Sequence, residues 1–226
     1  QALMSHHGIH PWRALTTTVA GRAVTYHVRP GLPAGAAVTP AALWLAQECT
    51  KYADPMLCID VAFALPALAW PQRVATVVTR HAGMAASLAQ SALPSVSDTT
   101  AIAPGAFQTV LIEVDPTREL WRQRIHTAWQ ALCVGGVLLV AGANDAGGKI
   151  AASDVNAIFG RCNEQSKHHH RLITAVKPAQ PASQPSWWQT ANAWVQVPYR
   201  NRIYATCAGV FAHDRVDAAT DLLCQH

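Results

Sequence analysis

The chain has 226 residues, half of them hydrophobic, which is enough for a sizeable core and excludes an intrinsically disordered protein. Charged residues make up only 13% of the chain, whereas an average globular protein has about 25%. The net charge of +4 permits a nucleic-acid partner without indicating one. The low charge indicates either a surface of small polar residues or a surface that a missing part of the protein covers.

Targeting signals and disulfide patterns are not recognisable in the sequence. The longest apolar stretch, residues 56–70, contains Asp60 and Pro66 and is shorter than the roughly 20 residues of a membrane span. The six cysteines are irregularly spaced, and several lie in apolar runs, where free thiols behave as small hydrophobes. We therefore expect a cytoplasmic protein without membrane contact.

The N-terminal part predicts a tail, a hairpin and a helix. We expect residues 1–14 to form a tail without fixed structure. Residues 15–29 are rich in Thr and Val on both sides of the turn dipeptide at 20–21, which predicts a β-hairpin. Thr39 and Pro40 are typical of an N-cap and a first helical residue, so we predict a helix from there to about Ala53.

From Met56 onward, short apolar runs alternate with helical patterns. The predicted strands span 56–63, 73–79, 99–103, 107–114 and 137–143, and the predicted helices span 82–93 and 117–133. Strands that are apolar on both faces and alternate with helices are typical of a parallel sheet. Residues 163–178 predict an antiparallel edge hairpin. The predicted fold class is α/β, with a Rossmann-like, mostly parallel sheet preceded by an N-terminal β-hairpin.

A repeat crosses a proline-rich linker. Residues 178–186 are rich in proline and uncharged, and we extend this linker to residue 199. Eight residues recur 178 positions later: Arg22 and Arg200, Tyr26 and Tyr204, Gly31 and Gly209, Ala34 and Ala212, Val38 and Val216, Ala41 and Ala219, Leu45 and Leu223, Gln47 and Gln225. We therefore interpret 15–177 as one domain and 200–226 as the start of a second domain of the same kind.

Two segments resemble the two-domain methyltransferases that modify ribosomal RNA guanines at N2. Residues 209–224 are similar to the entry segment of their catalytic domain, and residues 128–160 resemble the end of the same fold, with the pattern G-x-N-x-x-G-x-K from Gly142 to Lys149. The resemblance implies a class I methyltransferase fold and S-adenosylmethionine as the cofactor of the whole protein. It also implies a first domain that has lost cofactor binding, helps the protein to fold and holds RNA.

The residues at the expected cofactor turn depart from what that cofactor needs. A glycine-rich turn after the first strand lets the backbone approach the cofactor closely. Here Asp60 ends the strand, and Ala62, Ala64 and Pro66 stand where the glycines are needed. The alanine methyl groups fill cofactor space, and proline removes an N–H. We predict a degenerate site at these four residues.

Two further requirements of the family also fail. The next strand ends at Arg80 and His81, with no carboxylate to accept the ribose hydroxyls. Residues 115–117 are Asp-Pro-Thr, whereas the family has an Asn-Pro-Pro-aromatic turn that binds the guanine amino group. We therefore predict no cofactor and no catalytic residue in this chain.

Several other patterns have structural explanations. Consecutive residues of a strand point to opposite faces, so His168, His169 and His170 would not bind one ion together, and we predict no metal site. Asp60, Glu113 and Asp115 follow strands at the sheet edge where α/β proteins place ligands, but capping and turn formation account for them equally well.

Three basic residues and three tryptophans are candidates for RNA contacts. The residues 142–149 lack the spacing of a phosphate-binding P-loop, which leaves Lys149 a modest role at RNA phosphates, and Arg118 and Arg122 are further candidates. Trp187, Trp188 and Trp194 lie beside the linker. Base stacking is one explanation for them, and packing of the linker between two domains is the one we favour.

Taken together, these residues predict the N-terminal, non-catalytic half of a ribosomal RNA guanine-N2 methyltransferase. Its expected partners are ribosomal RNA and its own C-terminal catalytic domain, and the half alone is expected to self-associate. Two alternatives remain: an active methyltransferase with an atypical cofactor loop, in which Asp60 or Asp115 would hold the ribose, and a non-enzymatic interaction or dimerisation module.

Overall fold

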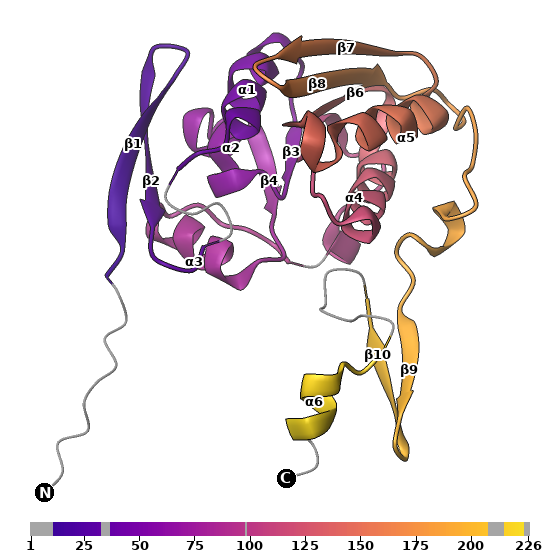
Figure 1. Cartoon of the computed structure of the whole chain (residues 1–226). Coiled ribbons are helices and arrows are strands. Elements are labelled where there is room, and N and C mark those ends of the chain that lie inside the picture. The colour runs from indigo at the N-terminus through magenta and orange to yellow at the C-terminus, as the bar shows by residue number, and fades with distance from the viewer. Residues whose placement is uncertain (1–10, 33–36, 98, 208–214, 224–226) are drawn as a thin grey trace, which may run out of the picture.

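The protein is described by a computed structural model that covers residues 11–32, 37–97, 99–207 and 215–223 (Figure 1). A six-stranded sheet in the order β4-β3-β5-β6-β8-β7 forms its centre. The strands are β3 (Met56–Ile59), β4 (Val74–Val78), β5 (Phe107–Glu113), β6 (Leu132–Ala143), β7 (Cys162–Lys167) and β8 (His170–Val176).

Strands β3 to β6 pair in parallel, whereas β8 is antiparallel to both β6 and β7. This arrangement confirms the predicted α/β fold with a mostly parallel, Rossmann-like sheet and an antiparallel edge hairpin. The carboxyl ends of β3, β4 and β5 meet at one edge of the sheet, which is where α/β folds place their ligand sites.

Helices cover both faces of the sheet, which explains why its strands are apolar on both sides. Met56 and Cys58 of β3 pack into one buried cluster, and Leu57 and Ile59 pack into another. The first cluster lies under α1 (Pro40–Glu48), α2 (Leu65–Ala69) and α3 (Ala82–Gln90), and the second under α4 (Arg118–Ala131) and α5 (Lys149–Phe159). Short 3₁₀ segments span Cys49–Lys51, Ala62–Ala64, Thr99–Ala101 and Trp188–Thr190, and a π turn spans Asn144–Gly148.

The N-terminal hairpin and the cap of the first helix are confirmed. Strands β1 (Arg13–Val19) and β2 (Arg22–Val28) pair around the turn at 20–21. Thr39 caps α1, because its hydroxyl oxygen accepts a hydrogen bond from the Ala42 amide at 3.0 Å. Residues 1–10 of the expected tail lie outside the described residues, and β1 begins two residues before the predicted hairpin.

Some predicted boundaries are wrong. Residues 99–103 are not a strand, because Thr99–Ala101 is a 3₁₀ turn. The strand predicted over 56–63 ends at Ile59, where Asp60 enters the left-handed region with φ 48°. Helix α1 ends at Glu48 and passes into a 3₁₀ turn. Gln123 of α4 is only 5% exposed and accepts a hydrogen bond from Arg80.

After the linker, a second hairpin and helix follow: β9 (Val195–Tyr199), β10 (Arg202–Thr206) and α6 (Ala218–Leu223). The Asp217 carboxylate accepts a hydrogen bond from the Thr220 amide at 3.1 Å, which is the capping contact of Thr39 repeated 178 positions later. The two hairpin turns are 180 positions apart, since Val19 pairs with Arg22 and Tyr199 with Arg202. The predicted matches of Arg22 with Arg200 and of Tyr26 with Tyr204 are therefore wrong by two residues. Residues 34, 208–214 and 224–226 of the repeat lie outside the described residues.

The sequence also predicted free cysteine thiols and the absence of a membrane span. Within the described residues, none of the helices has the length and apolar character needed to cross a membrane. The five cysteines in the described part of the chain are free thiols. Burial raises the pKa of the Cys49 thiol to about 12.

Candidate functional site

The turn after β3 lies at the ligand-binding edge of the sheet, and its own side chains fill it. Ala62, Phe63 and Ala64 are 8%, 0% and 1% exposed, respectively. The Phe63 ring packs on Tyr26 of the N-terminal hairpin, with ring centroids 4.6 Å apart. Asp60, Phe63 and Ala64 have φ values of 48°, 54° and 44°. Left-handed backbone favours glycine, so this turn has the conformation of a glycine-rich loop without the glycines.

The carboxylate of Glu113, at the end of β5, accepts a backbone hydrogen bond from this turn. Its Oε2 accepts a hydrogen bond from the Ala62 amide at 2.8 Å, and the Thr39 side chain hydrogen-bonds to the same carboxyl group. Burial raises the pKa of Glu113, while the bonds from Thr39 and Ala62 and the charge of Arg124 oppose that rise. A backbone amide of the turn is therefore hydrogen-bonded to a carboxylate of the chain itself.

Arg124 of α4 joins the ends of β3 and β5. Its Nε lies 2.9 Å from Asp60 Oδ2, and its Nη1 lies 3.3 Å from Asp115 Oδ2. Nη1 also donates to the Glu113 carbonyl at 3.4 Å. The side chains of Arg124 and Asp60 are only 12% and 8% exposed. The structure thus brings together the three acidic residues that the sequence placed at this edge, and links them through a cation.

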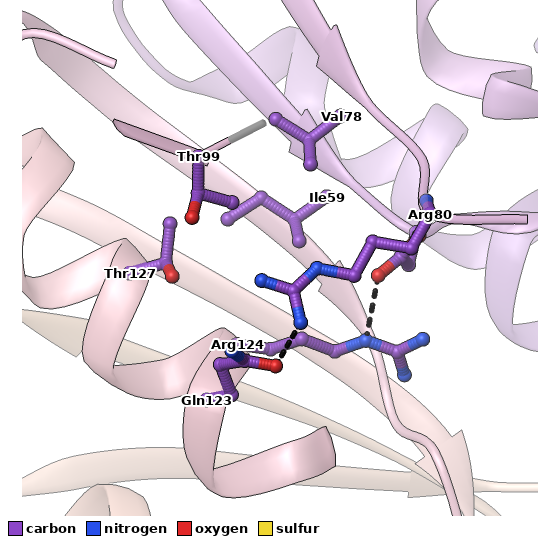
Figure 2. Close-up of a pocket in the computed structure, with 8 residues that line it drawn as sticks. Ile59, Val78, Arg80, Thr99, Gln123, Arg124 and Thr127 are labelled. Carbon is purple, nitrogen blue, oxygen red and sulfur yellow. Dashed lines mark hydrogen bonds and ion pairs between the residues drawn. The ribbon is translucent and has the colours of Figure 1, made fainter. Parts of the chain in front are cut away.

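Arg80 covers the adjacent side of the edge, at the end of β4. Its backbone amide donates to Asp60 Oδ1 at 3.1 Å, and its guanidinium group hydrogen-bonds to Gln123 Oε1. Figure 2 shows this guanidinium lying over Arg124, with Thr99 and Thr127 across the pocket. The cavity that these side chains enclose measures about 10 Å³, which is about the space of one water.

These residues do not fit S-adenosylmethionine. The turn that would accept its methionine part is itself buried, with Phe63 packed on Tyr26, and the Ala62 amide is already bonded to Glu113. The strand end that would supply a carboxylate for the ribose carries Arg80. The acidic group nearest to it, Asp60, is held by Arg124 and by the Arg80 amide. No reaction step is therefore assigned to this cofactor in the chain.

The segment from Gly142 to Lys149 connects β6 to α5. A Cβ atom on Gly142 would lie 2.5 Å from the Val114 Cβ, and one on Gly148 would lie 2.7 Å from the Ala143 carbonyl oxygen. Both glycines are thus needed for close packing, in agreement with a structural connection. Lys149 is exposed at the first position of α5.

The two arginines predicted to contact RNA lie in the first turns of α4. Arg118 is exposed, whereas Arg122 is half-buried, with its guanidinium carbon 5.0 Å from the centroid of the Trp187 ring. Burial lowers the pKa of Arg122. Both arginines act electrostatically on Asp154 of α5, and no described contact links either of them to Lys149.

The histidine run forms a turn rather than a continuous strand. His168 and His169 occupy the two turn positions between β7 and β8, with φ values of 47° and 61°. Only His170 lies in a strand, so the alternation expected for three strand residues is wrong. Within the described residues, no group of three or more His, Cys, Asp or Glu side chains is arranged to hold a metal ion.

Comparisons with known proteins identify the fold. No family model matches the sequence, and neither does any curated protein. The T. thermophilus 16S rRNA N2 G1207 methyltransferase, solved with AdoMet and guanosine, has a TM-score of 0.70 and 19% identity. The alignment covers 94% of this chain and 57% of that protein. The chain therefore spans just over half the length of this relative.

Two methyltransferases match over a smaller part of the chain. A predicted O-methyltransferase from Agrobacterium tumefaciens has a TM-score of 0.50 and 16% identity over 62% of this chain and 81% of its own. An SAM-dependent O-methyltransferase from Thermotoga maritima also has a TM-score of 0.50, with 11% identity over 74% of this chain and 78% of its own. The chain thus has the Rossmann-like fold of class I S-adenosylmethionine-dependent methyltransferases.

Sequence reasoning overlooked Arg124 and the role of Glu113. One signal for Arg124 was present, because it lies between Trp121 and Ala128 on the buried side of α4. A cation on an apolar helix face needs a buried partner. The bond from the Ala62 amide to Glu113 gave no such signal, since it joins residues 51 positions apart.

Proposed function

We propose that this chain is the N-terminal, non-catalytic part of an S-adenosylmethionine-dependent methyltransferase that acts on a ribosomal RNA guanine. In this proposal, residues 15–177 form a methyltransferase-like domain that serves as a scaffold and contacts RNA. The sequence places the linker at 178–199; because β9 already begins at Val195, residues 178–194 connect the first domain to a second, catalytic domain that begins with this strand. An RNA partner of this kind implies a cytoplasmic location.

The proposal rests on the bonds that the chain's own side chains make at the ligand-binding edge of the sheet. A methyltransferase fold is present. However, the Ala62 amide already donates a hydrogen bond to Glu113, and the Asp60 carboxylate is already paired with Arg124. A protein that keeps this fold while filling its cofactor site with its own side chains is expected to act as a scaffold rather than a catalyst.

The second domain is supported by the repeat. The hairpin of β9 and β10, followed by a helix capped by Asp217, repeats the hairpin of β1 and β2 and the helix capped by Thr39. The T. thermophilus rRNA methyltransferase is longer than this chain, which aligns with 57% of it. A protein of about 350–400 residues would have room for two domains of the usual size.

A methylation assay tests the proposed division of labour. The 226-residue chain is incubated with ribosomal RNA and labelled S-adenosylmethionine, beside the full-length natural protein. The proposal expects label in the RNA only with the full-length protein. Label transferred by the short chain would favour the active enzyme with an atypical loop, and replacing Asp60 or Asp115 would then show whether either carboxylate is needed.

The proposed partners are tested separately. We expect the chain alone to self-associate, because Trp194, Ile203 and Leu222 are 66%, 70% and 58% exposed. Light scattering that shows a clean monomer would contradict this part. RNA binding through Lys149, Arg118 and Arg122 is tested by replacing each with alanine and measuring affinity for ribosomal RNA at fixed salt, because contacts to phosphate are strongly salt-dependent.

A further inference from the structure

The linker is docked on the folded domain rather than free. Residues 178–199 contain no acidic or basic side chain, a composition typical of a linker. However, the Ala182 amide donates to the Ile158 carbonyl at 2.8 Å, and the Ser183 hydroxyl donates to the Ala157 carbonyl at 2.8 Å. Both acceptors lie in the last turn of α5, so the start of the linker is tied to that helix (Figure 1).

The second anchor is an aromatic contact with α4. Trp188 is only 7% exposed, and its ring centroid lies 4.7 Å from that of His126 and 6.1 Å from that of Trp129. Asn192 Nδ2 donates to His126 Nδ1 at 2.8 Å. His126 thus contacts the linker both through a ring face and through a hydrogen bond.

The protonation state of His126 decides whether the hydrogen bond from Asn192 holds. This bond needs an unprotonated Nδ1, because a protonated ring nitrogen donates and cannot accept. Burial lowers the pKa of His126 below its usual value of 6.5. The linker brings no charged group to the ring. Arg122 lies one turn earlier on α4, and Lys177, the residue before the linker, donates to the carbonyl oxygens of Trp129 and Leu132.

We infer that Trp188, Asn192 and His126 form a latch that holds the linker on α4 of the first domain, and that protonation of His126 opens it. The ring must be neutral in the docked state, and it regains water when the linker leaves. The closed state is therefore fully stable above pH 6.5 and weakens as the pH falls through the pKa of the docked histidine. Between those two values the open fraction grows by up to about tenfold per pH unit.

The latch itself rests on contacts within the described residues, and its effect on a second domain rests on the proposed function. In a chain of two domains, such a latch would limit the positions open to the second domain and would release it in acid. The linker would then be a positioning element rather than a flexible tether.

The test is an NMR titration of the ¹⁵N-labelled 226-residue chain from pH 8 to pH 5. The indole N–H signal of Trp188 is assigned by its loss in Trp188→Phe. We expect that signal to move from a docked to a released position with a midpoint below pH 6.5. The amide signals of β5 should stay in place, which shows that the sheet remains folded.

His126→Asn is the matched control, because its Oδ1 stands as many bonds from the backbone as the histidine Nδ1 and can accept the bond from Asn192 but does not titrate. We expect the Trp188 signal of this variant to keep its docked position from pH 8 to pH 5. Two results would overturn the inference. One is a wild-type Trp188 signal that keeps its docked position at pH 5, as it would if protonated His126 donated to Asn192 Oδ1. The other is an identical transition in His126→Asn.

Discussion

Arg124 Nε lies 2.9 Å from Asp60 Oδ2, and both side chains are almost completely buried at the edge of the sheet where related folds bind a ligand. The same arginine reaches Asp115 and the Glu113 carbonyl. One cation therefore ties the end of β3 to the end of β5. This is the edge at which open α/β sheets bind their ligands.

Removing that cation should destabilise the protein strongly. Arg124→Met leaves Asp60 buried without its charge partner, and breaking one side of such a pair costs about 3–5 kcal/mol. The free energy of unfolding in urea measures this. The double variant Arg124→Met with Asp60→Asn should recover part of the loss, since no isolated charge remains.

Arg118→Ala is the control for this experiment, because Arg118 is exposed and lies in the same helix. It should unfold at nearly the wild-type urea concentration. If Arg124→Met behaved like Arg118→Ala, the buried pair would not hold the sheet edge together.

Glu113 should make the protein's stability depend on pH. Burial raises its pKa in the folded state above the value of 4.5, so its contribution is favourable below pH 4.5 and is lost as the pH rises through the raised pKa. Glu113→Gln keeps an acceptor for the Ala62 amide and removes the titration. The variant should gain stability relative to wild type at pH 7, and the gain should shrink toward pH 4. A gain that does not change with pH would contradict this assignment.

Gly142 tests whether the segment after β6 serves packing. Gly142→Ala would place a Cβ atom 2.5 Å from the Val114 Cβ, and overpacking of this kind costs about 1–3 kcal/mol. Thermal unfolding measures the loss. Lys149→Ala, at the exposed end of the same segment, should leave the melting temperature unchanged. Equal melting temperatures for the two variants would argue against a packing role.

Thr39 is expected to stabilise the protein by capping α1. Thr39→Ala removes the hydroxyl that accepts from the Ala42 amide, and losing such a cap costs about 1 kcal/mol. It also removes a hydrogen bond to Glu113. Thr39→Ser keeps the hydroxyl and should retain most of the stability in urea unfolding. A serine variant as unstable as the alanine variant would show that the methyl group, not the hydroxyl, matters.

The sequence predicted the fold well, because the fold depends on local patterns. Runs that are apolar on both faces identified β3, β5 and β6, and Thr39 with Pro40 identified the start of α1. The 99–103 segment misled, since a short apolar run does not distinguish a strand from a 3₁₀ turn.

The site was predictable only in part. The absence of glycine at positions 62 and 64 can be read directly from the sequence. The contacts made there could not be predicted, because Glu113 meets the Ala62 amide 51 positions away, and Arg124 meets Asp60 64 positions away. Packing of the linker tryptophans was expected from the sequence, but the partners that α4 and α5 offer to Trp188 and Asn192 could not be predicted from it.

The most direct test of the central claim is a calorimetric titration of S-adenosylmethionine into the 226-residue chain, with the T. thermophilus 16S rRNA methyltransferase, which was solved with AdoMet, as the positive control. We expect no saturable heat and no rise in melting temperature for the chain, beside clear binding by the control. Saturable binding to the chain at micromolar concentration would contradict the proposal that its own side chains fill the cofactor site.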